Sequence, residues 1–153
     1  MKNILSILIL LCGISSCTKA PRLVEVDKGY SSTSVNTTIF RNSSLASFEG
    51  KQYIAYYDAE GWMVIGSRLL NEDTWTLKRS QYKGNVKDAH NVISLMVDGE
   101  GYLHVAFDHH GHPLNYCRSV APHSLELGDK ESMTGVDEKD VTYPEFYRLA
   151  NGD

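Results

Sequence analysis

The chain has 153 residues, and 15 lysines and arginines against 19 aspartates and glutamates give it a formal net charge of −4. Without a basic stripe or interleaved basic and aromatic residues, the chain lacks the electrostatic pattern of a nucleic-acid-binding protein. Three cysteines are present, and only Cys117 lies beyond residue 17. The sequence therefore excludes a disulfide framework, and we expect an ordinary hydrophobic core to stabilise the fold.

The first residues follow the order of a bacterial export signal. Lys2 precedes an apolar run from Ile4 to Leu11, which is too short to span a bilayer as a mature helix. Small residues then lead to Cys17, and Ile14-Ser15-Ser16-Cys17 resembles a lipobox. The pattern predicts a lipoprotein signal peptide over residues 1–16 and lipidation of Cys17, while an ordinary signal peptide followed by a chance cysteine stays open.

The mature protein is accordingly expected to be exported and anchored to the bacterial outer membrane by its lipid. Residues 17–30 would form the lipidated cysteine and a tether. Whether the protein faces the periplasm or the cell surface stays open.

From residue 31 onward, the apolar pattern is typical of β-strands. Short runs rich in aromatic and β-branched residues occur at 53–57, 62–65, 75–77, 92–97 and 102–107. Turn signals flank them at 49–50, 60–61, 71–73, 98–101 and 151–153. Strands at this even spacing, with no convincing amphipathic helix, predict an all-β meander.

An internal repeat with a period of about 50 residues runs through this region. A gap-free shift aligns Ser44-Leu45 with Ser94-Leu95, Asp58 with Asp108, Gly61 with Gly111, Arg68 with Arg118, and Leu77 with Leu127. A four-stranded unit at this spacing is typical of a β-propeller blade, and coincidence among common residue types is the alternative.

Residues 31–153 are therefore predicted to hold two blades and the start of a third near residue 143. Propellers close with four to eight blades. We expect the chain to be the N-terminal part of a longer propeller, truncated at its C-terminus.

Five of the six histidines lie between residues 90 and 112. His90 precedes the first strand of the second blade, and 109–112 follow its second strand, so both segments are expected at the same end of the blade. Three interpretations stay open: a transition-metal site of imidazoles and an aspartate, polar loop residues without chemistry, or a catalytic pair. No cofactor or metal ligand is predicted, because no tight ligand spacing is present, and a divalent metal stays open.

Three stretches around these histidines resemble the BNR-repeat-containing family, a sialidase-like group of β-propellers that includes ulvan lyases and related uronate polysaccharide lyases. They are Asp88-Ala89-His90-Asn91, the run from Val97-Asp98-Gly99 to Asp108-His109-His110-Gly111-His112, and Val141-Thr142-Tyr143-Pro144-Glu145-Phe146. The resemblance covers 85–153 well and 31–82 more loosely, and it implies a seven-bladed propeller when complete.

In the lyase members, two histidines of these motifs and a later tyrosine line the cleft. The resemblance therefore implicates His90, His110 and Tyr143 as catalytic residues. It also implies an arginine on a strand shortly beyond residue 153. Tyr143 has an alternative role as a blade-core aromatic beside Pro144.

Further candidates follow from the same motifs. Because two histidines are adjacent, His109 is an alternative to His110 as the active ring. Asn91 and His112 are predicted to contact the substrate.

The function implied by the resemblance is β-elimination on uronate-containing glycans, so the expected partner is an anionic polysaccharide. His110 or Tyr143 would serve as base or acid, and His90 would help hold the substrate carboxylate.

Two other functions stay open. One is a glycan-binding propeller without catalysis, in which Tyr56, Tyr57 and Trp62 stack on sugars. The other is a sialidase-like glycoside hydrolase, although the repeated Asp58 and Asp108 are predicted to be turn residues instead of a catalytic pair.

Overall fold

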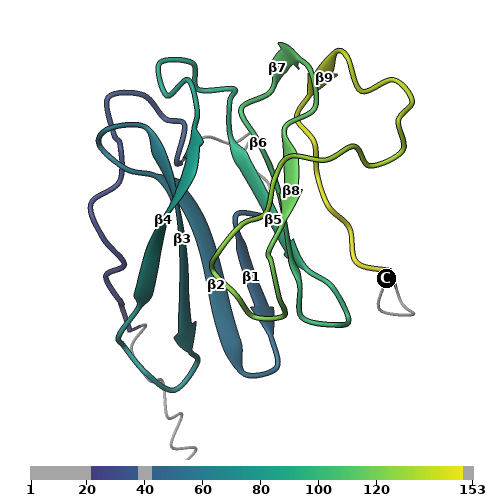
Figure 1. The fold of residues 1–153 in the computed structure, drawn as a ribbon. Coiled ribbons are helices and arrows are strands. Elements are labelled where there is room, and N and C mark those ends of the chain that lie inside the picture. The colour runs from purple at the N-terminus through teal and green to yellow at the C-terminus, as the bar shows by residue number, and fades with distance from the viewer. Residues whose placement is uncertain (1–21, 38–42, 150–153) are drawn as a thin grey trace, which may run out of the picture.

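The computed structural model describes residues 22–37 and 43–149, and within these ranges it contains antiparallel sheets and no helix (Figure 1). One sheet has the strand order β1 (Leu45–Phe48), β2 (Lys51–Tyr57), β3 (Trp62–Leu69) and β4 (Thr76–Lys83). The second sheet consists of β5 (Ile93–Val97), β6 (Leu103–Phe107) and β8 (Tyr116–Arg118). A ribbon of β7 (His110–His112) and β9 (Val141–Thr142) lies at one end. The predicted all-β class is confirmed.

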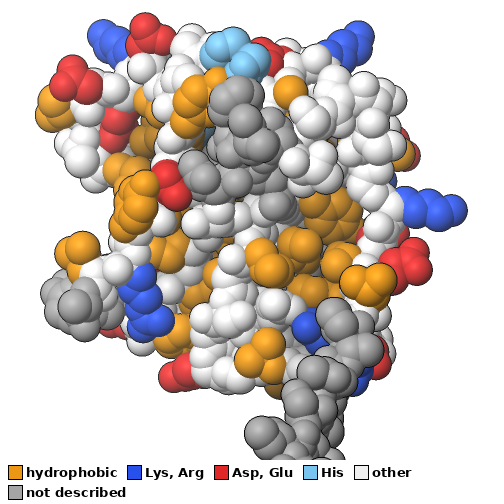
Figure 2. Space-filling view, turned by 180° about the vertical axis from the view of Figure 1, so that it is seen from behind, with side chains coloured by type: hydrophobic (Ala, Val, Ile, Leu, Met, Phe, Trp, Pro, Cys, Tyr) orange, Lys and Arg blue, Asp and Glu red, His pale blue; other side chains and the backbone are white. Residues whose placement is uncertain are grey.

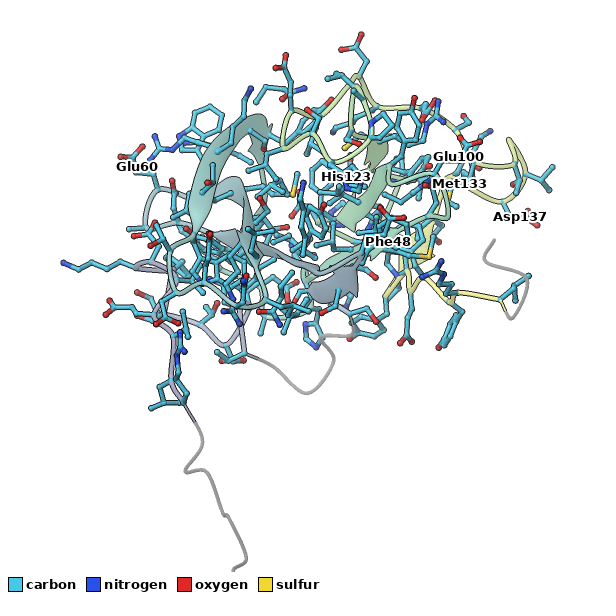
Figure 3. The ribbon with its side chains drawn as sticks, turned by 90° about the horizontal axis from the view of Figure 1, so that it is seen from below. Phe48, Glu60, Glu100, His123, Met133 and Asp137 are labelled. Atoms are coloured by element: carbon cyan, nitrogen blue, oxygen red, sulfur yellow. The ribbon has the colours of Figure 1, made fainter. Side chains whose placement is uncertain are left out.

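The core forms between the two larger sheets because their strands alternate in the side chains that they bury. In β2, Tyr53, Ala55 and Tyr57 are buried in it, and β6 contributes Leu103, Val105 and Phe107. Near the end that Figure 3 views from below, the Tyr53 hydroxyl lies 2.8 Å from Nδ1 of His123, whose ring centroid is 5.9 Å from that of Phe48. Apolar packing and this hydrogen bond together join the sheets.

The internal repeat corresponds to the sheet topology. The strands β1, β2 and β3 occupy the same places in the first sheet as β5, β6 and β8 do in the second. Asp58 directly follows β2, and Asp108 directly follows β6. The two sheets are therefore successive units of one architecture.

The strand register corrects the gap-free alignment beyond Asp108. In the first sheet Gly66 lies opposite Ile54, and in the second sheet Arg118 lies opposite His104. Arg118 therefore corresponds in space to Gly66, and its alignment with Arg68 was wrong by two residues. The reason is a longer connection in the second sheet, where the paired residues Ala106 and Tyr116 are ten positions apart, whereas the corresponding pair Tyr56 and Val64 is eight positions apart.

Several predicted features lie outside the described residues. These are the signal peptide over 1–16, the lipidated Cys17 and the turn at 151–153. Residues 143–149, where a third blade was expected to begin, contain no strand. Across 22–37 and 43–149, no helix has the length and apolar character needed to cross a membrane.

Candidate functional site

The connection between the two sheets, residues 84–92, carries His90 and is held by the first sheet. The buried Tyr57 hydroxyl donates a hydrogen bond of 3.0 Å to the carbonyl of Asn91. A Cβ atom at Gly84 would lie only 2.5 Å from the Tyr57 ring, so glycine permits this close approach. The position of His90 thus depends on a side chain from the neighbouring blade.

The connection after β6 carries His110 and is fixed to the loop of His90. Asp108 has a φ of 63°, and its Oδ1 accepts a 2.6 Å hydrogen bond from the backbone N–H of Asn85. Farther along, the N–H of Gly111 donates to Oγ1 of Thr142 at 2.9 Å, where β7 pairs with β9. These contacts bring His90, His110 and the segment after Thr142 to one end of the molecule.

At this end, Asp88 bridges two histidines, and we call Asp88, His90 and His110 the Asp88 cluster. Oδ1 of Asp88 lies 2.6 Å from Nδ1 of His90, and Oδ2 lies 2.7 Å from Nδ1 of His110. The two imidazole centroids are 4.3 Å apart. The His110 side chain is 44% exposed, and Figure 2 shows histidine side chains at this end of the surface. The Asp88 cluster is therefore accessible to a ligand.

The protonation of the two rings follows from the charge on Asp88. The backbone N–H of His90 and the ring N–H groups of His110 and His90 hold the pKa of the Asp88 carboxyl far below its ordinary value. An ionised carboxylate only accepts hydrogen bonds, so Nδ1 of each histidine carries a proton. In His110 the lone pair of the neutral ring then lies on Nε2, on the other side of the ring from Asp88.

Tyr143 completes the group that the sequence predicted. Its ring centroid lies 5.9 Å from that of His90 and 6.4 Å from that of His110. Its φ of 51° is unusual for a residue other than glycine, and its side chain is partly exposed. The structure thus brings His90, His110 and Tyr143 together, and their catalytic roles stay a prediction.

The adjacent histidines 109 and 110 have different environments. His109 is 1% exposed, and its Nε2 accepts a 2.7 Å hydrogen bond from the backbone N–H of Asn115. Burial, together with the charges of His112 and Lys130, lowers the pKa of His109 to about 4. His109 therefore holds the connection after β6 in place by packing in the interior and by this hydrogen bond. The geometry does not favour it as the active ring.

Asn91 and His112 were predicted to contact the substrate. The structure corrects the prediction for Asn91, which is fully buried and whose Nδ2 donates to the carbonyl of Asn85 at 3.3 Å. His112 is exposed, and its Nδ1 accepts a 3.1 Å hydrogen bond from the backbone N–H of His110. Only His112 of this pair has a surface that a substrate can reach.

Asp88 lies within the motif Asp88-Ala89-His90-Asn91, but the motif alone does not assign it a role. A signal was present, because an aspartate two residues before a histidine can accept that residue's backbone N–H in an Asx turn. Oδ1 of Asp88 does so from His90 at 2.9 Å. What the sequence did not show is that the same carboxylate also reaches His110.

The first sheet does not offer the aromatic surface expected of a sugar-binding platform. Tyr57 is fully buried, and Tyr56 is 6% exposed with its hydroxyl donating to Oδ2 of Asp27 at 2.8 Å. Trp62 is partly covered, with Lys83 Nζ lying 4.4 Å from its ring centroid. The expectation that these aromatic residues stack on sugars was wrong for both tyrosines.

An open hollow of about 850 Å³ lies beside the β7–β9 ribbon. Its charged lining is mainly acidic: Lys130, Glu131, Asp137, Glu138, Lys139 and Asp140. This balance does not favour an anionic polymer in the hollow. The Asp88 cluster is the better candidate for chemistry on such a ligand.

Comparison with known proteins shows the family of the chain. The family model described as BNR repeat-containing family member matches residues 51–153. Two solved structures resemble the chain, one described as an ulvan lyase of polysaccharide lyase family PL25 and one as that lyase bound to -[GlcA(1-4)Rha3S]-. A comparison with curated proteins finds no match.

Both lyase structures share the fold of this chain at low sequence identity. Each has a TM-score of 0.60 and 18% identity, covering 74% of this chain and 30% of the lyase chain. The chain thus spans about 30% of the length of these lyases. The two sheets are blades of a β-propeller, as predicted, and because the family model covers most of the sequence, the chain belongs to the BNR repeat-containing family.

Proposed function

We propose that this protein is a polysaccharide lyase that cleaves uronate-containing glycans by β-elimination. One observation carries the proposal: His90 and His110 both hydrogen-bond to the carboxylate of Asp88, and the Tyr143 ring lies beside them. The likeness in fold to an ulvan lyase bound to a uronate-containing saccharide supports the choice of substrate class.

The reaction requires a base, and His110 has the suitable atom. With its Nδ1 proton held by Asp88, the neutral ring has its lone pair on Nε2. Nε2 would take the proton from the carbon α to the uronate carboxylate. The electron pair of that C–H bond then forms the carbon–carbon double bond while the bond to the glycosidic oxygen breaks. Tyr143 would give the leaving oxygen its proton.

The carboxylate of the uronate must be neutralised, because removal of the α proton adds negative charge beside it. His90 is suited to this role, since its protonated ring would carry a positive charge next to the substrate while Nδ1–H remains on Asp88. The arginine that the resemblance implies beyond residue 153 would add a second positive group.

The test is an assay on ulvan and other uronate-rich glycans, following the ultraviolet absorbance of an unsaturated product. The protein is expressed from the whole coding frame of its gene, so that every encoded blade is present. We expect His110→Ala to lower kcat by roughly 10²–10⁴-fold, because general base catalysis contributes about this much. Asp88→Asn should lower it by about 10²-fold or more, because an amide NH₂ cannot accept the second ring N–H.

His123→Gln is the matched control, because His123 lies outside the Asp88 cluster and hydrogen-bonds Tyr53. It should keep the rate of the unmodified protein. Near-normal turnover by His110→Ala would refute the assignment. Reducing ends without an unsaturated product would indicate a hydrolase, and binding without any product would indicate a glycan-binding propeller.

We also propose that the protein is exported and anchored to the outer membrane through Cys17, on the basis of residues 1–17 alone. Radiolabelled palmitate should be incorporated into the protein in a bacterial host, and Cys17→Ser should abolish the labelling. Labelling that persists in this variant would exclude Cys17 as the lipidated residue.

A further inference from the structure

We infer that the Asp88 cluster is a binding site for a divalent transition-metal ion of the zinc class. One carboxylate and two imidazoles form the ligand set, and one ligand atom from each residue lies within 4.8 Å of the others. The inference concerns binding and does not rest on the proposed lyase activity.

The spacing of the ligand atoms suits a tetrahedral ion after a small adjustment. Bonds of about 2.0–2.1 Å to nitrogen and oxygen place neighbouring ligand atoms about 3.3 Å apart. The two oxygen–nitrogen separations here are 2.6 and 2.7 Å, each occupied by one N–H proton. These separations involve different oxygens of Asp88, so an ion that binds one of the oxygens and both Nδ1 atoms would replace the two protons after a small shift of the rings. Partly exposed side chains at a loop surface have room for this shift.

The ligand types select the class of ion. Imidazole nitrogen suits zinc, copper and nickel, whereas magnesium and calcium take sets composed of oxygen atoms. Three protein ligands also leave a fourth position of a tetrahedral ion open to water or to a ligand oxygen.

The two loops that carry the ligands are held in place by contacts outside the Asp88 cluster. Tyr57 holds the carbonyl beside His90, and Oδ1 of Asp108 joins the loop of His110 to that of His90. Binding therefore requires little ordering of the chain, which favours affinity.

Metal binding has a consequence for the proposed chemistry. The ion would occupy the same two imidazoles that the lyase mechanism uses for proton transfer and carboxylate binding. If the lyase proposal holds, zinc should inhibit the reaction, and EDTA should restore it.

The direct test is isothermal titration of the purified protein with ZnCl₂, without any glycan. We expect one zinc ion per chain and no heat of binding with MgCl₂ at the same concentrations. His90→Ala, His110→Ala and Asp88→Asn should each weaken zinc binding by roughly 100-fold, because each removes one of three ligands. His123→Gln should bind as the unmodified protein does, although His123 also has a carboxylate, that of Glu49, within 3.7 Å of its Nε2.

A second measurement does not depend on whether the variants fold. In NMR spectra of the unmodified protein, zinc should shift the ring signals of His90 and His110 and leave those of His123 unchanged. Absence of binding, or unchanged affinity in folded His110→Ala, would overturn the inference. Lyase activity measured in EDTA is independent of these results, so zinc binding without a lyase reaction, or the reverse, separates the two proposals.

Discussion

The two blades share one strand order but differ in the connection after their second strand. In the first blade, Asp58 closes a short hairpin, and its Oδ1 accepts hydrogen bonds from the backbone N–H groups of Glu60 and Trp62. In the second blade, Asp108 takes the same place, yet its Oδ1 accepts from Asn85 in a different loop. The chain then runs through eight residues, 108–115, before it rejoins the sheet.

This difference shows how one of two blades with the same strand order can carry a candidate functional site. The short hairpin satisfies its own backbone groups and presents no histidine, while the longer connection can turn one histidine inward and the next outward. His109 is buried against Asn115, and His110 reaches Asp88. The candidate chemistry therefore depends on loop length at one blade end, where changes leave the strand pairing intact.

The largest effect expected is on stability at acid pH, through the inward histidine of the longer loop. Burial keeps the pKa of His109 at about 4 in the folded protein, below the ordinary value of 6.5. Below about pH 6.5 the unfolded chain therefore binds a proton that the folded chain does not. The free energy of unfolding should fall by about 3 kcal/mol between pH 7 and pH 4 through this residue.

Urea denaturation at several pH values in EDTA measures this effect. His109→Gln is the comparison, because its side-chain oxygen can still accept from the backbone N–H of Asn115 while it does not titrate. The variant should lose this part of the pH dependence. If the free energy of unfolding depends on pH equally in both proteins, His109 does not remain neutral in the folded protein as we expect.

A smaller effect on stability is expected where Tyr57 of the first blade contacts the connection 84–92 that carries His90. Gly84→Ala places a methyl group 2.5 Å from atoms of the Tyr57 ring. We expect a loss of about 2 kcal/mol in the free energy of unfolding, as is usual when a packed core is overfilled. Gly128→Ala is the matched control, since its nearest contact is the Arg118 carbonyl oxygen at 3.4 Å. Equal stability of the two variants would mean that Tyr57 does not constrain the loop of His90.

The smallest effects test the two aspartates directly. Asp58→Ala removes an acceptor of two hairpin N–H groups, and Asp108→Ala places alanine at a φ of 63°. Each change should cost about 1 kcal/mol in the free energy of unfolding. Only Asp108→Ala should weaken zinc binding, by about threefold to tenfold, because it frees the loop of His90. If both variants bind zinc equally well, the contact from Asp108 to Asn85 does not position the site.

Much of the fold could be predicted because strand alternation and turn chemistry are local. The predicted run 53–57 lies within β2, and the run 102–107 contains the whole of β6. Gly61 and Gly101 have the positive φ that their turns require. The two-residue error in the repeat arose because a gap-free shift does not detect a longer loop. Strand pairing across the sheet was needed to locate it.

The sequence by itself determined the all-β class, the blade order and the expectation that His90 and His110 share one end of the second blade. It also held a signal for the burial of His109, because residues 103, 105 and 107 alternate inward and 109 continues this parity. Only the tertiary structure decided that Asp88 bridges both rings, that Asn91 is buried and that Tyr57 holds the loop from the neighbouring blade. These contacts join residues from separate loops and blades, and the distance between such residues is fixed by packing and not by local sequence pattern.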